Sequence, residues 1–147
     1  MPREFHFPTQ VTWEGGRRTS ARVDGKQPIS IATPPEFRGE DPGTWSPEDF
    51  LTAAAASCLA VTIVSLAEHK EVPLRSLAVR GDGVVGRRGD GRFGFVRLDQ
   101  EVRIGTDQGF EERARAVVED AEAGCLVAVS LDVPVATSVE VEIAAPV

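Results

Sequence analysis

The stretch that decides the fold is Ser46–His69, SPEDFLTAAAASCLAVTIVSLAEH. Ser46 is a favourable helix N-cap, and Pro47 suits the first helical position because its fixed φ fits there. Glu48 and Asp49 follow, where carboxylates interact favourably with the positive end of a helix. No Gly or Pro interrupts the chain after Pro47, so the stretch predicts one long helix. Its middle is apolar on nearly every face, which is typical of a helix buried all round, in the core or at a subunit interface.

The residues before this helix predict strands. Apolar residues of one parity recur over residues 4–14, which is strand spacing, and the Gly15-Gly16 pair then indicates a turn. Further strands are expected over residues 17–23 and 29–31, so this part of the chain is interpreted as an N-terminal hairpin with a short strand after it. Residues 34–45 are rich in Pro, Gly and charge, and they predict a surface loop.

The residues after the helix predict two strands, a second helix and a last strand. Residues 74–88 and 92–104 have strand character and are joined around the turn Gly89-Asp90-Gly91. An apolar stripe at helical spacing predicts a helix over residues 108–123. Strict alternation of apolar with other residues over 133–143 predicts the last strand.

The order of these elements, β-β-β-α-β-β-α-β, predicts an α+β fold. The chain length fits one domain, and no repeat or linker divides residues 1–147. The net charge of -7 disfavours nucleic acid or an anionic membrane as a partner, because both need a positive surface. No apolar run reaches the ~20 residues of a membrane span, and the N-terminus lacks the apolar core of a secretory signal. We therefore expect a cytoplasmic protein that binds neither nucleic acid nor membrane.

The two cysteines, Cys58 and Cys125, are the candidate chemistry of the chain. A pair 67 positions apart is not the disulfide framework of a secreted protein, and a cytosolic pair that bonds is typically redox-active. Each cysteine alone is more typical of the core, since free Cys is often buried and burial leaves a thiol inert. Cys58 lies about three turns into the long helix, where the helix dipole has little effect, so a reactive Cys58 needs a cation from elsewhere in the chain.

Arg17 and Glu48 are the candidates for that charged environment. Most arginines at turns are only solvated, but a guanidinium after the Gly15-Gly16 turn could hold a thiolate and a carboxylate together. Glu48 is an available carboxylate, although its simplest role is to interact with the helix N-terminus. Ten residues separate Glu48 from Cys58, which is ~15 Å of rise in one straight helix. One Arg17 head group cannot touch both, so a shared site requires either a break in the helix or a second subunit.

Three motifs, in this order, resemble those of the OsmC/Ohr family, named for osmotically inducible protein and organic hydroperoxide resistance. The motifs are Thr12–Arg17 (TWEGGR), Ser46–Leu51 (SPEDFL) followed by Ala53–Cys58 (AAAASC), and Gly124–Leu131 (GCLVAVSL). The resemblance runs nearly end to end, and it includes the spacing of ten positions between Glu48 and Cys58. In the best-studied members the second cysteine is followed by Pro and a Ser-Asn pair. Leu126 and Ala128-Val129 stand there in this chain, and a Leu at the first of these positions is common in the OsmC-like branch, to which the chain is expected to belong.

The resemblance implies an intertwined homodimer with active sites at the subunit interface and a long buried central helix. It implies that Cys58 is the peroxidatic thiolate and that Cys125 is the resolving cysteine. Arg17 corresponds to the arginine that stabilises the thiolate, and Glu48 to the carboxylate that orients this arginine. The implied activity is the reduction of organic hydroperoxides, with recycling by a small dithiol such as a lipoyl group and with no metal or bound cofactor.

Two other classes of protein stay open. The same fold could serve as a binding or redox-sensing protein without efficient peroxidase turnover, or as a structural protein with two inert cysteines. A metal site is the weakest hypothesis, because His6 and His69 are the only histidines. His69 lies ~16 Å of helical rise beyond Cys58, and it is more typical of a C-terminal residue that interacts with the helix dipole.

Overall fold

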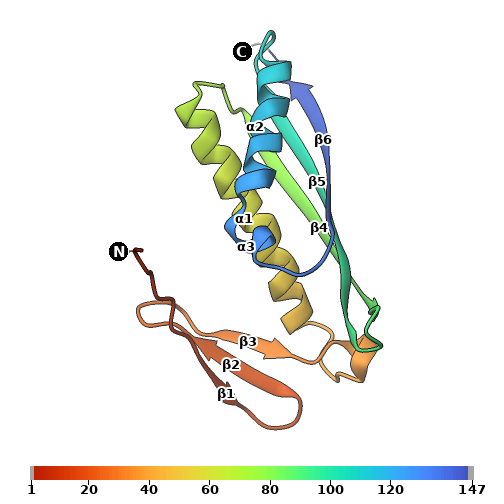
Figure 1. Cartoon of the computed structure of the whole chain (residues 1–147). Helices are drawn as coiled ribbons and strands as arrows, with labels where there is room; N and C mark the ends of the chain where they lie inside the picture. Colours follow the sequence, from red (N-terminus) through yellow and green to blue (C-terminus); the bar gives the residue numbers. More distant parts are fainter. Residues whose placement is uncertain (1, 146–147) are drawn as a thin grey trace. The chain divides into compact units, whose positions relative to one another are not determined.

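The computed structural model describes residues 2–145, which form two compact units (Figure 1). The first unit ends at Phe50 and the second begins at Leu51, so the division falls inside helix α1 (Pro47–His69). Each unit has its own three-stranded sheet. The assignment of residues 1–147 to one domain stays a prediction.

The first unit is an antiparallel sheet in the order β1-β2-β3. Its elements are β1 (Gln10–Trp13), β2 (Arg18–Arg22), β3 (Ile29–Ala32) and a short 3-10 helix, η1 (Pro35–Phe37). The prediction of a strand over residues 4–14 was too long at its start. Pro8 has no backbone N–H to donate to a neighbouring strand, and residues 2–9 are exposed.

The turn between β1 and β2 confirms the role of the two glycines. Gly15 and Gly16 have φ values of 93° and 55°, in the left-handed region that residues with a Cβ rarely adopt. The indole N–H of Trp13 donates to the Gly16 carbonyl at 2.9 Å, which closes the turn over the end of β1. Arg17 therefore leaves the turn with a backbone direction that the glycines determine.

Helix α1 begins where the sequence predicts. The Ser46 hydroxyl accepts from the Asp49 amide at 3.1 Å, and the Asp49 carboxylate accepts from the Ser46 amide at 2.9 Å. This reciprocal pair satisfies two backbone donors that the helix itself leaves unpaired. The helix then continues without interruption to His69, so a break between Glu48 and Cys58 is contradicted.

Within the single chain α1 is buried along one face only, so of the two expected settings, the core and a subunit interface, the core accounts for part of its surface. One stripe at intervals of four residues is buried: Ala55, Leu59, Ile63 and Ala67. The opposite face carries small and apolar side chains that are exposed, with Val61 at 60% and Val64 at 36%. By length and composition alone, α1 is long and apolar enough to cross a membrane. Its most apolar 18-residue window has a mean hydropathy of 2.1, and 22% of that window is buried inside the chain. Core helices of soluble proteins pass the same test of length and composition, and the face of α1 that carries Val61 and Val64 is exposed in the single chain.

The second unit is a sheet in the order β4-β5-β6, with α1 and α2 on one face (Figure 1). Its strands are β4 (Ser76–Arg87), β5 (Phe93–Thr106) and β6 (Val135–Ile143), and its other helices are α2 (Glu111–Gly124) and α3 (Leu126–Val129). Strands β4 and β5 form the predicted antiparallel hairpin, whereas β6 lies parallel to β5 after the crossover through α2. The predicted order of elements is confirmed, with η1 and α3 as short additions.

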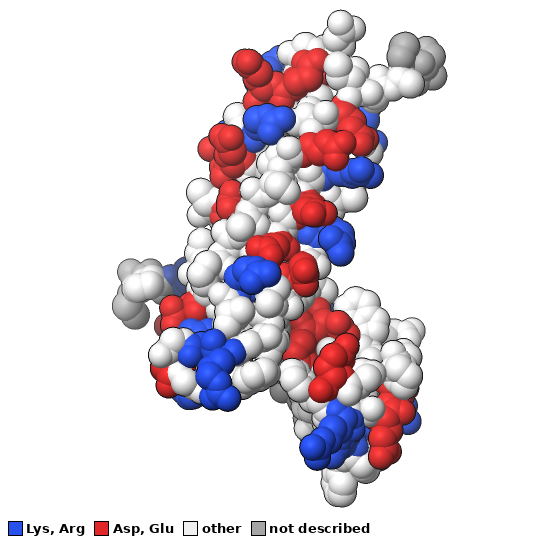
Figure 2. Space-filling view, turned by 90° about the vertical axis from the view of Figure 1, so that its right-hand side faces the viewer, with Lys and Arg blue, Asp and Glu red and all other residues white. Residues whose placement is uncertain are grey.

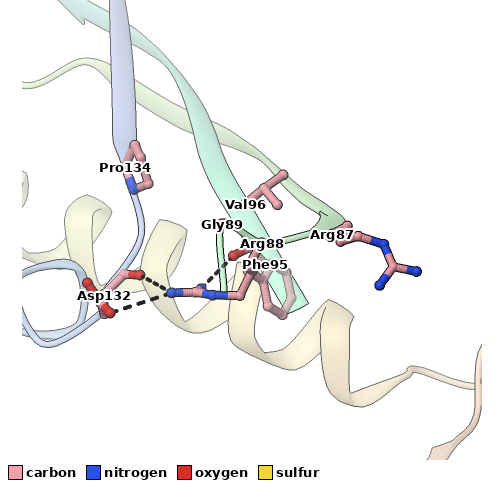
Figure 3. Close-up of a pocket in the computed structure, with 7 residues that line it drawn as sticks. All are labelled: Arg87, Arg88, Gly89, Phe95, Val96, Asp132 and Pro134. Atoms are coloured by element: carbon pink, nitrogen blue, oxygen red, sulfur yellow. Dashed lines mark hydrogen bonds and ion pairs between the residues drawn. The ribbon is translucent and has the colours of Figure 1, made fainter. Parts of the chain in front are cut away.

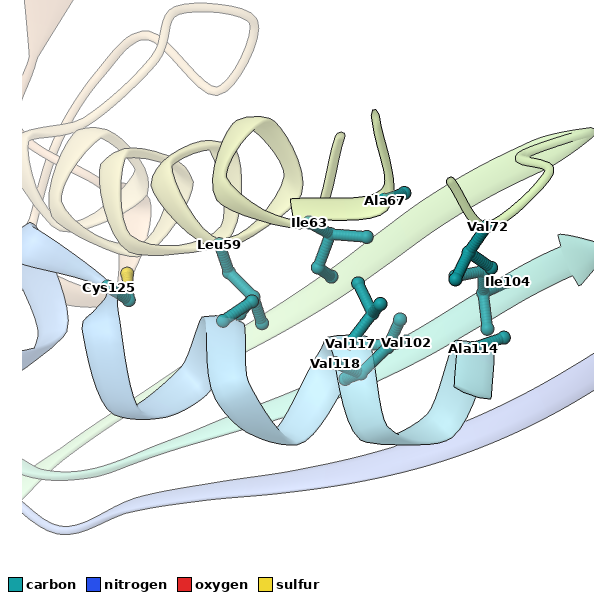
Figure 4. Close-up of a cluster of buried hydrophobic side chains, with 11 residues drawn as sticks. Leu59, Ile63, Ala67, Val72, Val102, Ile104, Ala114, Val117, Val118 and Cys125 are labelled. Carbon is teal, nitrogen blue, oxygen red and sulfur yellow. The ribbon is translucent and has the colours of Figure 1, made fainter. Parts of the chain in front are cut away.

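The core of the second unit fills the space between the two long helices and β5 (Figure 4). It is formed by fully buried side chains from the three elements: Leu59, Ile63, Val102, Ile104, Val117 and Val118. Each such side chain contributes ~1.5–3 kcal/mol by leaving water. Cys125 lies at one end of this cluster, so the core fixes the position of a thiol.

Helix α1 approaches β4 closely because β4 has glycines where the two elements cross. A Cβ on Gly83 would lie 2.2 Å from Thr52 Oγ1 and 2.7 Å from Phe95 Cε1. A Cβ on Gly81 would lie 3.1 Å from Thr52 Cγ2 and 3.5 Å from Ala56 Cβ. Small residues on both elements therefore set the depth at which the Cys58 helix lies on the sheet.

We expect Gly83→Ala to destabilise the protein by ~1–3 kcal/mol, because the new methyl group overlaps Thr52 and Phe95. Gly86→Ala in the same strand is the matched control, since its nearest neighbour would lie 3.7 Å away. Urea unfolding followed by circular dichroism compares the two midpoints. Equal midpoints for the two variants would contradict the close approach of α1 to β4.

Candidate functional site

The structure brings Cys58 and Cys125 together in the second unit. Cys58 comes from α1 and is half-buried, and Cys125 lies between α2 and α3 and is buried. Both are free thiols, and the Cys125 thiol lies within hydrogen-bonding reach of the Cys58 sulfur. Two residues that are far apart in the sequence thus meet because α1 and α2 pack side by side on the same sheet.

Hydrogen-bond donors converge on the Cys58 sulfur. Burial raises the pKa of the Cys58 thiol, but the Val127 amide, the Cys125 thiol and the Leu126 amide outweigh this effect and lower the pKa below its ordinary value. The two amides belong to the first turn of α3, where backbone N–H groups have no partner inside the helix. A negative charge on Cys58 is thus stabilised by neighbouring dipoles of its own unit.

Cys125 has the opposite character. Burial raises the pKa of its thiol, and the hydrogen bond and charge shared with Cys58 raise it further. The Cys125 Sγ lies 3.9 Å from the Ala55 carbonyl oxygen, so its single hydrogen has two acceptors available. A thiolate at Cys58 attracts that hydrogen more strongly than a neutral carbonyl does. The pair therefore consists of one thiol that ionises readily and one that keeps its proton.

The donors on Cys58 were not predicted from the sequence. Residues 126–131 read as an apolar run, LVAVSL, without the Gly, Pro or Asn that mark a turn. The chain nevertheless forms the four-residue helix α3, in which the Val129 amide donates to the Cys125 carbonyl at 3.0 Å. Gly124 at the end of α2 was the one visible signal, because a helix end frees the chain to turn.

The lowered pKa of Cys58 predicts which thiol is alkylated first. Because the thiolate is the nucleophile, the rate at Cys58 is expected to rise with pH through a midpoint below that of an ordinary cysteine. Iodoacetamide modification of Cys125→Ser across pH 5–10, followed by mass spectrometry, measures this midpoint.

The variant Cys125→Ala removes a donor to the sulfur, so its Cys58 midpoint is expected above that of Cys125→Ser, which keeps a hydroxyl. In Cys58→Ala the remaining Cys125 is expected to react slowly, with a midpoint above that of Cys58. Identical midpoints for Cys58 in the Ala and Ser variants would show that the second thiol is not a donor.

Arg17 lies in the first unit, on the turn side of β2. Its side chain is exposed, and Nη1 donates to the carbonyl oxygens of Arg38 and Phe37, the latter at 3.4 Å. The Arg17 carbonyl accepts from the Thr33 amide at 3.1 Å. These contacts connect Arg17 with the loop after β3, so both the backbone and the head group of Arg17 have defined positions within its unit.

Glu48 lies in the first turn of α1 and is half-buried. The structure has α1 unbroken from Pro47 to His69, so one of the two routes to a shared site, a broken helix, is excluded. Arg17 and Glu48 belong to the first unit and the cysteines to the second. The assignment of all four residues to one site stays a prediction.

No group of three or more His, Cys, Asp or Glu residues within residues 2–145 is placed to hold a metal ion. His69 lies in the last turn of α1, as expected for a residue near the negative end of a helix. Acidic and basic side chains are interspersed on the face shown in Figure 2, without a broad basic area for a polyanion.

The fold is that of an α+β protein with a long central helix, and comparison with known proteins identifies the family. The model of the family described as OsmC-like protein matches residues 39–140. The chain belongs to the OsmC-like family, and the predicted resemblance is confirmed. In this fold α1 is the core helix.

One curated protein and several solved structures are similar to this chain. The uncharacterized protein YmaD of Bacillus subtilis is 29% identical over 83 residues, which is 56% of this chain and 55% of that protein. The chain thus matches about half the length of this curated relative. An OsmC-like protein of unknown function from Vibrio cholerae has a TM-score of 0.85 at 18% identity, covering 93% of this chain and 100% of the other. An organic hydroperoxide resistance protein from Elizabethkingia anophelis has a TM-score of 0.78 at 17% identity, covering 98% and 100%.

Proposed function

We propose that the protein is a cytoplasmic thiol peroxidase that reduces organic hydroperoxides. The observation that carries this proposal is the set of donors on the Cys58 sulfur, which lowers the pKa of that thiol beside a second thiol. Membership of the OsmC-like family supports it, and a structural neighbour is named for organic hydroperoxide resistance. Two inert core cysteines would not require this arrangement of donors.

The reaction uses two thiols and an external dithiol. The Cys58 thiolate attacks the distal peroxide oxygen, the O–O bond breaks, and the alkoxide takes a proton and leaves as the alcohol. Cys58 is thereby oxidised to a sulfenic acid. The Cys125 thiol gives up its proton, its sulfur attacks Cys58, and hydroxide leaves as water while the disulfide forms. A small dithiol or lipoyl group then reduces this disulfide by exchange, and no metal or bound cofactor takes part.

The low pKa of Cys58 and the high pKa of Cys125 suit these two roles. Attack on a peroxide requires a thiolate at working pH, whereas the resolving thiol is useful as a proton source until the sulfenic acid has formed. Arg17 is assigned to stabilise the Cys58 thiolate further, and Glu48 to orient Arg17. Both of these roles rest on the family motif around each residue.

Cumene hydroperoxide is expected to consume both thiols of the reduced protein, and dihydrolipoamide to restore them over repeated cycles. Cys58→Ser is expected to lose turnover to the background rate. Cys125→Ser is expected to stop at a sulfenic acid that dimedone traps at Cys58. Free thiols are counted with a chromogenic disulfide after each step, and mass spectrometry identifies the dimedone adduct at Cys58.

Different outcomes separate the alternatives. One round of oxidation without repeated turnover by any dithiol would favour a binding or redox-sensing protein of the same fold. Turnover by Cys58→Ser equal to that of the unsubstituted protein would overturn the assignment of the nucleophile.

The second part of the proposal is a homodimer whose site combines two subunits. Because α1 is unbroken, a second subunit is the remaining way for Arg17 and Glu48 to serve Cys58 together. The outer stripe of α1, with Ala54, Ser57, Val61 and Val64, is exposed and consists of small or apolar residues. Such a stripe suits close contact with another copy of the chain, which would cover the apolar surface.

Complementation tests this shared site. Arg17→Gln and Cys58→Ser are each expected to be inactive, and light scattering is expected to give twice the chain mass of 15.8 kDa. When the two variants are unfolded together and refolded, about one quarter of the activity is expected to return, because half of the dimers are mixed and each has one intact site. Arg18→Gln is the control, since Arg18 pairs with Asp41 at 2.9 Å. No recovery of activity would place Arg17 and Cys58 of one site in the same subunit.

A further inference from the structure

A hollow of about 350 Å³ lies between the tip of the β4–β5 hairpin and the segment that leads from α3 into β6 (Figure 3). Phe95 and Pro134 form part of its wall, and the Arg88 side chain lies across it. Arg87, next in the chain, also lines this hollow, but its guanidinium points away from Asp132 and donates to the Gly91 carbonyl of its own turn at 2.9 Å. Neighbouring arginines thus have different surroundings, and only Arg88 reaches across to another segment.

The Arg88 guanidinium connects two segments that are far apart in the sequence. Its Nη1 donates to the Phe95 carbonyl at 2.7 Å, which fixes the head group to β5. Its Nη2 donates to the Asp132 carbonyl at 3.1 Å and lies 3.5 Å from the Asp132 carboxylate. The Arg88 side chain is 30% exposed, whereas Asp132 projects fully into solvent. The contact to the Asp132 backbone is therefore better shielded from water than the ion pair.

The segment that Arg88 holds is the one that carries the donors to Cys58. Asp132 follows α3 by three residues, and the backbone hydrogen bonds within the turn itself are local ones. The Ser130 amide donates to the Val127 carbonyl at 3.1 Å, and the Leu131 amide to the Ala128 carbonyl at 3.2 Å. These bonds maintain the shape of the turn, but they do not attach it to the sheet.

Burial attaches this turn only in part. Leu126 is 71% exposed and Val129 is 64% exposed, and Ala128 is the residue of α3 that packs against the core. The turn is therefore anchored by α2 and Cys125 at its start and by Ala128 in its middle. At its end it is anchored by Arg88 and, two residues after Asp132, by the Leu98 amide of β5, which donates to the Pro134 carbonyl at 2.9 Å.

We propose that Arg88 is a positioning residue, which anchors the segment after α3 to the β4–β5 hairpin and so keeps the Leu126 and Val127 amides on the Cys58 sulfur. Arg88 acts through geometry, because its planar fork reaches two carbonyl groups at once and a lysine ammonium on a flexible stem does not reproduce this. The stretch of α1 between Asp49 and Glu68 has no charged side chain. Cys125, between α2 and α3, is the titratable group that shares a hydrogen bond with Cys58. The consequence for catalysis rests on the proposed peroxidase function, but the anchoring of the turn does not.

The test compares Arg88→Gln with Arg87→Gln, both in a Cys125→Ser background. The pH dependence of iodoacetamide modification reports the state of Cys58 without any peroxide. Arg88→Gln is expected to raise the midpoint by half to one unit, which slows modification at pH 7 roughly three- to tenfold. Arg88→Lys is expected to behave like Arg88→Gln, and Arg87→Gln like the parent protein.

An unchanged midpoint in a folded Arg88→Gln variant would overturn the proposal. Full restoration by Arg88→Lys would overturn it too, since the positive charge and not the fork would then be the cause. If Arg88→Gln does not fold, amide hydrogen exchange in Arg88→Lys, compared with the unsubstituted protein, is the second measurement. Faster exchange at Leu126 and Val127 supports the anchor, and unchanged exchange overturns it. Failure of the unsubstituted protein to reduce peroxides would refute the proposed function alone, because none of these measurements depends on turnover.

Discussion

The close contact between α1 and β4 is the constraint on which the rest of the second unit depends. Gly81 and Gly83 leave room for Thr52 and Ala56, so the helix lies deep on the sheet. At that depth the stripe from Ala55 to Ala67 meets α2 and β5, and the cluster becomes continuous. The position of Cys58 relative to Cys125 follows from this packing, because α1 carries the first thiol and the end of α2 presents the second.

The chemistry of the thiol pair arises from a helix end and not from a charged side chain of the same unit. Amides at the start of α3 donate to the Cys58 sulfur because the first turn of any helix leaves its N–H groups unpaired. Cys125, shielded from water, retains its hydrogen and donates it to the same sulfur. Backbone amides do not change charge with pH, so these donors act on Cys58 at any working pH as long as the turn that carries them keeps its position.

Much of the fold could be predicted from the sequence, since local signals and tertiary packing agree in most elements. The capping pair of Ser46 and Asp49, the alternation in β6 and the Gly-Gly turn each act over a few residues and need no distant partner. The turn at Leu126–Val129 could not be predicted, because its apolar residues resemble a strand and its shape depends on the packing of Cys125 and Ala128. For α1 the sequence left open the core and a subunit interface, because apolar composition indicates that a face will be covered but not whether the same chain covers it.

The separation of Cys58 and Cys125 along the chain has a consequence for folding stability. The two residues stand 67 positions apart, so a bond between them would close a loop that holds nearly half of the sequence. In the chain-entropy model such a cross-link restricts the unfolded ensemble and stabilises the native state by about 4 kcal/mol. The oxidised protein would then melt at a higher temperature than the reduced one. The melting temperature of a sample would therefore report the fraction of the protein that peroxide has converted to the disulfide form.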